Sequence, residues 1–128
     1  MARAGSAATV VTWGVGVHWA LDAAAALSSE GQEIEVVDLR SLLPWDTETV
    51  LASVRRTGRA LVLHEAPLTG GFGGEVAATI GHDAFEWLDA PVARLGALDT
   101  PSPFSKALED LFSPKARVGA ALHELLAW

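Results

Sequence analysis

Short apolar runs and segments of helical character alternate along this chain. The apolar runs are rich in β-branched residues and predict strands at residues 8–13, 34–39, 60–64 and 91–95. The segments after them predict helices at about residues 17–29, 46–57, 74–80 and from 114 onward. The third of these helices has room to continue as far as Phe85. The chain therefore reads as four strand-then-helix units.

Individual residues predict where several of these elements begin and end. Gly31 closes the first helix, Asp46 is placed to cap the second, and Gly58 is placed to end it. Two prolines in residues 99–104 predict a rigid loop after the fourth strand. An apolar stripe marks one face of the last helix, formed by Val118, Leu122 and Leu125.

This order predicts an α/β fold in three layers, α/β/α, around a mostly parallel sheet of four to five strands. The 128 residues are enough for one domain with a substantial core. No internal repeat, linker or low-complexity segment divides them. We therefore treat residues 1–128 as a single domain.

Charge and cysteine content exclude several classes of function. The chain has 16 acidic against 9 basic residues and a net charge of −7, which argues against binding to nucleic acid or to an anionic membrane. It has no cysteine, so thiolate catalysis, disulfides and cysteine-ligated zinc are excluded. Residues 1–6 lack the apolar core of a signal peptide, and no apolar run approaches a membrane span. We expect a cytoplasmic protein, or a mitochondrial matrix protein if the source is eukaryotic.

The most distinctive segment is residues 64–75, where a strand ends at His64-Glu65, turns at Pro67 and enters a helix through four glycines. Such a segment places polar side chains and unpaired N–H groups at the carboxyl edge of a parallel sheet. An anion-binding loop usually includes Lys or Arg, but residues 60–93 contain neither. The segment therefore favours contact with another protein over ligand binding.

Three residues are candidates for acid–base chemistry: His18 in the first turn of a helix, His64 and Glu65. All three are expected near the same edge of the sheet, although the sequence leaves their separation open. The histidines lack the i, i+4 spacing of a metal site. There is also no nucleophile elbow and no Walker loop.

A nucleotide-binding interpretation rests on Gly14-x-Gly16 after the first strand and Asp38 at the end of the second. Trp19 stands where the third glycine of a dinucleotide fingerprint belongs, and its indole would separate the helix from the strand. A tight strand-to-helix turn is the favoured explanation. An independent Rossmann-like or flavodoxin-like nucleotide-binding module is the alternative.

The order of several motifs resembles one known family. The motifs are Thr12-Trp13-Gly14 with Val17-His18, Val37-Asp38-Leu39-Arg40 with Leu43-Pro44-Trp45-Asp46, His64-Glu65-Ala66-Pro67 with Gly70-Gly71-Phe72-Gly73, and the late loop Asp99-Thr100-Pro101. From about Gly5 to Leu126 the chain is similar to the transketolase C-terminal-like domain. The similarity is closest to the beta subunit of thiamine-diphosphate-dependent 2-oxoacid dehydrogenases, the pyruvate and branched-chain enzymes.

The resemblance implies a role in assembly rather than catalysis by this domain alone. In the complete enzyme a preceding pyrimidine-binding domain activates thiamine diphosphate, and the alpha subunit holds the diphosphate and magnesium. The C-terminal domain contacts a second beta subunit and docks the subunit-binding domain of the acyltransferase core. We therefore expect no cofactor on this domain, no activity from it in isolation, and support of 2-oxoacid decarboxylation and acyl transfer to lipoamide in the complex.

The resemblance and the glycine-rich segment together give the expected contact residues. These are His18, His64, Glu65, Pro67, Gly70, Gly71, Phe72 and Gly73, with no catalytic and no metal-binding residue among them. We expect a homodimer with Phe72 near the centre of the contact. The equivalent domain of transketolase or deoxyxylulose phosphate synthase is a further alternative, although sugar-phosphate substrates would favour basic residues at this edge.

The family also has an antiparallel edge strand before the residues that match Ala8. Only residues 1–7 precede that position here, so we expect this strand to be truncated or absent, which leaves an edge of the sheet exposed. We therefore expect the chain to be a fragment of a longer beta subunit.

Overall fold

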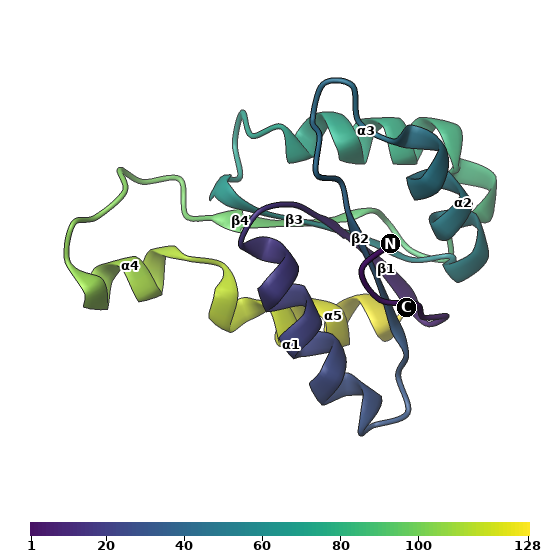
Figure 1. Ribbon diagram of the computed structural model, residues 1–128, viewed down its shortest axis with the longest axis horizontal. Helices are drawn as coiled ribbons and strands as arrows, with labels where there is room; N and C mark the ends of the chain where they lie inside the picture. The colour runs from purple at the N-terminus through teal and green to yellow at the C-terminus, as the bar shows by residue number, and fades with distance from the viewer.

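The computed structural model describes all of residues 1–128 and shows three layers (Figure 1). A four-stranded sheet in the order β2-β1-β3-β4 has every neighbouring pair parallel. The strands are β1 Ala8–Thr12, β2 Ile34–Asp38, β3 Ala60–Pro67 and β4 Ala93–Ala97. The helices are α1 Gly16–Ser28, α2 Thr47–Thr57, α3 Gly73–Asp83, α4 Lys106–Phe112 and α5 Val118–Leu126. The predicted α/β/α architecture is confirmed.

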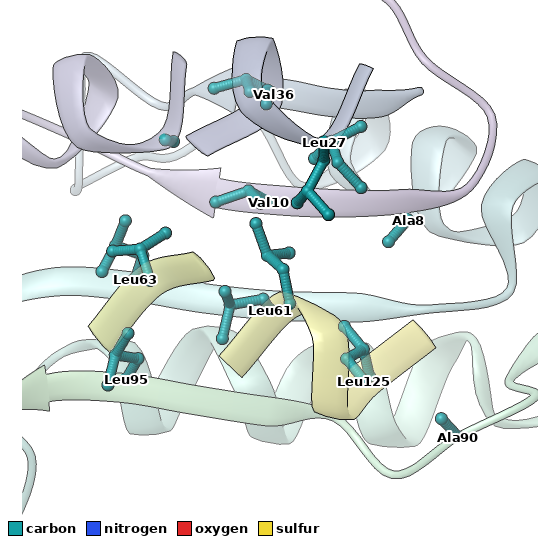
Figure 2. Packing of buried hydrophobic residues seen from close by; sticks show 14 residues of the cluster. Ala8, Val10, Leu27, Val36, Leu61, Leu63, Ala90, Leu95 and Leu125 are labelled. Atoms are coloured by element: carbon teal, nitrogen blue, oxygen red, sulfur yellow. The ribbon is translucent and has the colours of Figure 1, made fainter. Parts of the chain in front are cut away.

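The core has two halves because the sheet is covered on both faces. Helices α1 and α5 cover one face, where Val10, Leu61 and Leu63 pack against Leu27 and Leu125 (Figure 2). Helices α2 and α3 cover the other face with a second apolar cluster. Side chains of alternate residues along a strand therefore enter opposite halves of the core. This explains why the strands read as nearly continuous apolar runs rather than as an alternating pattern.

Local signals located several boundaries correctly. The Thr49 N–H donates to the Asp46 carboxylate at 3.0 Å, so Asp46 caps α2 as expected. Gly58 ends that helix with a φ of 71°, in the left-handed region. Strand β3 is three residues longer than predicted, and its pairing with β4 is irregular between Leu63 and Pro67. Helix α3 stops at Asp83, and residues 85–87 form a separate 3₁₀ turn.

Helix α4 was not predicted, and it is the largest departure from the sequence interpretation. None of its seven residues is buried. Ser105 caps its start, and the Ser105 hydroxyl accepts a hydrogen bond from the Leu108 N–H at 3.4 Å. We call residues 98–113 the α4 arm, because they extend from the body of the domain (Figure 1). A helix is recognised in a sequence by an apolar face that packs on a core, whereas the apolar side chains of α4 face solvent.

The antiparallel edge strand is reduced to a single bridge between Arg3 and Val36. The Val36 N–H donates to the Arg3 carbonyl at 2.9 Å, and the Arg3 N–H donates to the Val36 carbonyl at 3.2 Å. Only one position of β2 is therefore covered on its outer edge in this way.

A buried carboxylate ties the first residues to the sheet and to α2. Glu35 lies on β2, and its carboxylate accepts hydrogen bonds from the Ser53 hydroxyl, the Arg56 guanidinium and, at 3.2 Å, the Gly5 N–H. Thr9 extends the network with its hydroxyl 2.7 Å from that of Ser53. Burial alone would raise the pKa of Glu35, but these hydrogen bonds outweigh it and lower the pKa.

Replacing Arg56 with Met should destabilise the domain at pH 7 by about 1–3 kcal/mol, because a buried carboxylate loses a charged donor. The lowered pKa of Glu35 gives stability that is present above its ordinary value of 4.5 and is lost as the pH falls through the folded-state pKa. The cost of Arg56→Met should therefore shrink toward acid pH in urea titrations. The matched change Arg40→Met removes an ion pair whose Arg side chain is 86% exposed, and it should cost under about 1 kcal/mol. An equal cost for both variants, independent of pH, would contradict this assignment.

Candidate subunit-contact site

The loops that follow β1, β3 and β4 meet at one edge of the sheet, because parallel strands share the edge at which they end. We call this surface the crest and define it as residues 13–16, 65–72 and 98–102. It contains most of the glycine-rich segment and the base of the α4 arm.

The His64 ring fills the space beneath the crest. Its residue is 1% exposed, and its ring stacks on Trp13 with 5.6 Å between centroids and 12° between planes. A methyl group added at Gly71, Gly73 or Gly96 would lie 2.8, 2.3 or 2.9 Å from a His64 ring atom. Three glycines are thus needed so that the backbone can close around this ring. These glycines, two of them in the glycine-rich segment, thus approach a side chain of the same domain.

The His64 imidazole also lacks strong polar partners and a charge near pH 7. Neither ring nitrogen makes a well-formed hydrogen bond. Burial lowers the pKa of His64, the backbone of Ala66 opposes this shift, and the charge of Arg94 adds to it. The ring is therefore neutral near pH 7 and is closed off from solvent. These properties do not suit a group that exchanges protons with a substrate.

Phe72 packs mainly within the domain. Its ring meets Trp13 edge to face at 6.0 Å, and it contacts the cluster between the sheet and helices α2 and α3. Gly70, with a φ of 72°, forms the turn before it. Phe72→Ala would therefore disturb the domain itself, whatever the part of Phe72 in the expected contact between subunits.

A pair of hydrogen bonds joins the crest to the α4 arm. The Thr69 N–H donates to one carboxylate oxygen of Asp99 at 2.9 Å, and the Thr69 hydroxyl donates to the other at 2.6 Å. The Thr69 hydroxyl and then its N–H are the main causes that lower the pKa of Asp99. This clasp fixes the base of the arm against the segment that precedes α3.

The other predicted contact residues are divided between the surface and the turn. Glu65 and Pro67 are exposed at the end of β3, and His18 is exposed in the first turn of α1. No hydrogen bond or ion pair joins His18, His64 and Glu65, so the suggested acid–base trio is not assembled in this structure.

Two hollows lie between the crest and the α4 arm. One has a volume of about 460 Å³ and the other about 220 Å³, and both are lined by Glu65, Ser102 and Phe112. Trp13 lines the larger and Trp19 the smaller. Sequence reasoning did not assign Trp13, Trp19 or Phe112 to this surface. The available signal was the pair of tryptophans, one directly after β1 and one in the first turn of α1.

The nucleotide-binding alternative loses its structural basis. Gly14 has a φ of 59°, as a tight turn requires, and a methyl group at Gly16 would lie 2.3 Å from the Thr12 hydroxyl. The Asp38 carboxylate accepts two hydrogen bonds from Arg40, from its backbone N–H and its Nε, both at 3.1 Å. These residues serve the turn and its packing rather than a ribose or a pyrophosphate.

The glycine-rich segment does not fit a magnesium-bound diphosphate. No group of three or more His, Cys, Asp or Glu side chains is arranged to hold a metal ion in residues 1–128. The space under the glycine-rich segment is filled by His64, and that segment has no Lys or Arg.

No helix of the structure is both long and apolar enough to cross a membrane.

Comparison with known proteins agrees with this geometry. The profile of the transketolase C-terminal domain family matches residues 1–118. The 2-oxoisovalerate dehydrogenase subunit beta 2, mitochondrial, of Arabidopsis thaliana is 50% identical over 101 residues, which cover 79% of this chain and 28% of that protein. The pyruvate dehydrogenase E1 component subunit beta of Leifsonia xyli is 50% identical over 114 residues, which cover 89% of this chain and 34% of that protein.

A solved structure shows the same fold. A chain described as a split gene transketolase, inactive beta4 tetramer, superposes with a TM-score of 0.80 at 32% sequence identity, over 98% of this chain and 40% of the other. The fold and crest thus define a transketolase C-terminal-like domain, and this chain belongs to that family. Its curated relatives include beta subunits of pyruvate and branched-chain 2-oxoacid dehydrogenases, and it spans about a third of their length.

The enclosure of His64 gives a direct prediction. Gly73→Ala places a methyl group against the His64 ring and should destabilise the domain by about 1–3 kcal/mol. Gly81→Ala in the same helix meets nothing within 4 Å and should stabilise it by about 0.5–1 kcal/mol. Thermal or urea unfolding of both variants measures the difference. If the two substitutions shift stability in the same direction, His64 is not enclosed as described.

Proposed function

We propose that this chain is the C-terminal assembly domain of a 2-oxoacid dehydrogenase beta subunit. The main support is that the only imidazole beneath the crest is buried and neutral, and that no group of three or more His, Cys, Asp or Glu side chains in the domain is arranged to hold a metal ion. Such a surface suits contact between proteins better than chemistry on a small substrate. The relatives that are 50% identical to this chain are beta subunits, which is consistent with this role.

Within the complete enzyme, the partners of this domain are a second beta subunit, the alpha subunit and the subunit-binding domain of the acyltransferase core. The domain then supports oxidative decarboxylation of a 2-oxoacid and acyl transfer to lipoamide without touching the reacting atoms. Thiamine diphosphate and magnesium are held by the other parts of the enzyme. The complex operates in the cytoplasm, or in the mitochondrial matrix of a eukaryote.

The groove between α3 and β4 is the surface we assign to the subunit-binding domain. It has a volume of about 890 Å³. Small residues of α3 form its floor, namely Gly74, Ala77, Ala78 and Gly81. Exposed Phe85 and Trp128 border it, and Arg94 and Asp89 supply charge at its rim. Apolar surface beside exposed aromatic rings and opposite charges is typical of a protein contact.

The proposal predicts a sharp difference between this chain alone and the same chain in a full subunit. We would build a chimera in which it replaces the matched residues of the Leifsonia xyli beta subunit, and express this chimera with the alpha subunit of that enzyme. The chimera should associate with the alpha subunit and reduce a dye with pyruvate, thiamine diphosphate and magnesium. The isolated chain should give no heat of binding with thiamine diphosphate or with NAD.

The outcomes of this experiment are distinct. Micromolar binding of thiamine diphosphate to the isolated chain would contradict the assembly role, and binding of NAD would favour the nucleotide-binding alternative. A folded chimera that fails to associate with the alpha subunit would also contradict the proposal.

A substitution at Glu65 distinguishes a contact role from a catalytic role, because the Glu65 carboxylate is exposed on the crest. In the active chimera, Glu65→Gln should leave the turnover rate and its pH dependence unchanged within about twofold. A general acid or base at this position would instead cost about 10²- to 10⁴-fold and remove one limb of the pH profile. Turnover measured from pH 5.5 to 9, with subunit association followed in parallel, distinguishes the two roles. A large rate loss in a fully assembled enzyme would place Glu65 in an active site.

A further inference from the structure

The α4 arm carries apolar side chains that the rest of the domain does not cover. Phe104 is fully exposed, Leu111 is 72% exposed and Leu108 is 55% exposed. The arm extends away from the sheet and from α1 and α5 (Figure 1). An exposed group of large apolar residues on one small element is a sign of an interaction surface.

The spacing of these residues matters as much as their exposure. Leu108 and Leu111 stand at i and i+3 in the α4 helix, so they lie on one face of it, and Phe104 lies just before Ser105, the residue that caps the helix. Lys106 and Asp110 form an ion pair of 2.7 Å on another side of the same helix. An amphipathic helix that enters an apolar groove uses anchors at this spacing.

The base of the arm is held in place before any partner binds. At its base the Leu98 N–H donates to the Phe112 carbonyl at 3.3 Å, and the Thr69–Asp99 clasp fixes the neighbouring residue. The Arg117 guanidinium donates to the Gly96 carbonyl at 2.8 Å just beyond the arm. Because the base is already fixed, docking of the arm loses less entropy than docking of a free segment would. A helix of seven residues that buries nothing is only marginally stable by itself, which leaves the arm dependent on an external cover.

We propose that the α4 arm docks, through Phe104, Leu108 and Leu111, into an apolar groove on the remaining two thirds of a beta subunit. This proposal rests on the proposed function and identifies the surface that contacts the rest of the enzyme. About 66% of the Leifsonia xyli subunit lies outside the matched region, since that region is 34% of its length. This is enough polypeptide to supply the groove. The arm also continues directly from the crest, so both form one contact surface.

Hydrogen exchange of the amides in residues 106–112 tests the proposal. We would compare the isolated chain with the Leifsonia xyli chimera described above, using mass spectrometry. The arm should exchange at least tenfold more slowly in the chimera, because the groove covers it. Leu108→Glu combined with Leu111→Glu should return exchange in the chimera to the rate of the isolated chain. Leu43→Glu is a matched control, because Leu43 is 85% exposed on a loop outside the arm.

Two controls keep the result interpretable. In the isolated chain, the double Glu variant should shift the unfolding midpoint by no more than about 2 °C, because both side chains are already exposed. Exchange of α3 in the chimera reports whether the variant is folded. If the double variant fails to fold, Leu111→Ser is the milder substitute, and it should speed exchange of the arm by at least threefold.

Three results would overturn the proposal. The first is equally fast exchange of the arm in the isolated chain and in the chimera. The second is unchanged exchange of the arm when the double Glu variant is made in the folded chimera. The third is slow amide exchange of the arm already in the isolated chain, with exchange that slows further as protein concentration rises. That result would identify a second copy of this domain as the occupant. Association of the chimera with the alpha subunit is scored separately. An active chimera with a rapidly exchanging arm refutes the docking proposal alone, whereas a protected arm without association refutes the proposed function alone.

Discussion

The enclosure of one imidazole ring determines the shape of the functional edge of this domain. His64 ends the regular part of β3, and its ring occupies the space where a larger residue at position 71, 73 or 96 would collide with it. Because these three glycines come from the loop before α3, from α3 itself and from β4, closing around the ring brings those elements together. Trp13 completes the enclosure from the end of β1. The positions of the crest loops therefore follow from one packing arrangement rather than from a ligand.

This arrangement stabilises the crest loops without supplying a group suited to proton transfer. A ring that is buried, neutral and without a well-formed hydrogen bond stabilises the loops above it but is poorly placed to move protons. The clasp between Thr69 and Asp99 extends the rigid region to the base of the α4 arm. The arm in turn presents apolar side chains to its surroundings. The result is a surface held by internal contacts with an apolar extension, which is consistent with the assembly role proposed above.

Features set by neighbouring residues could be predicted from the sequence, whereas features set by distant contacts could not. Asp46 and Gly58 bound α2 through interactions within one turn of chain, so their roles were visible. The role of the glycines near residue 71 could not be predicted, because they close on a ring from another element and the sequence does not say what a glycine approaches. Helix α4 was missed although Ser105 and the spacing of Phe104, Leu108 and Leu111 were present, since a helix is normally recognised by the core face that α4 lacks.

The state of the His64 ring tests this account most directly. A nuclear magnetic resonance titration of all four imidazoles follows each ring in the folded domain. The account predicts that His64 titrates below its ordinary pKa of 6.5 because of burial, while the pKa of His123 lies above that value because of its bond to Glu30. The His64 resonances should also show no exchange broadening with solvent near pH 7. A His64 ring that titrates at or above 6.5 would be open to solvent, and it would contradict the claim that the glycines of this edge serve internal packing.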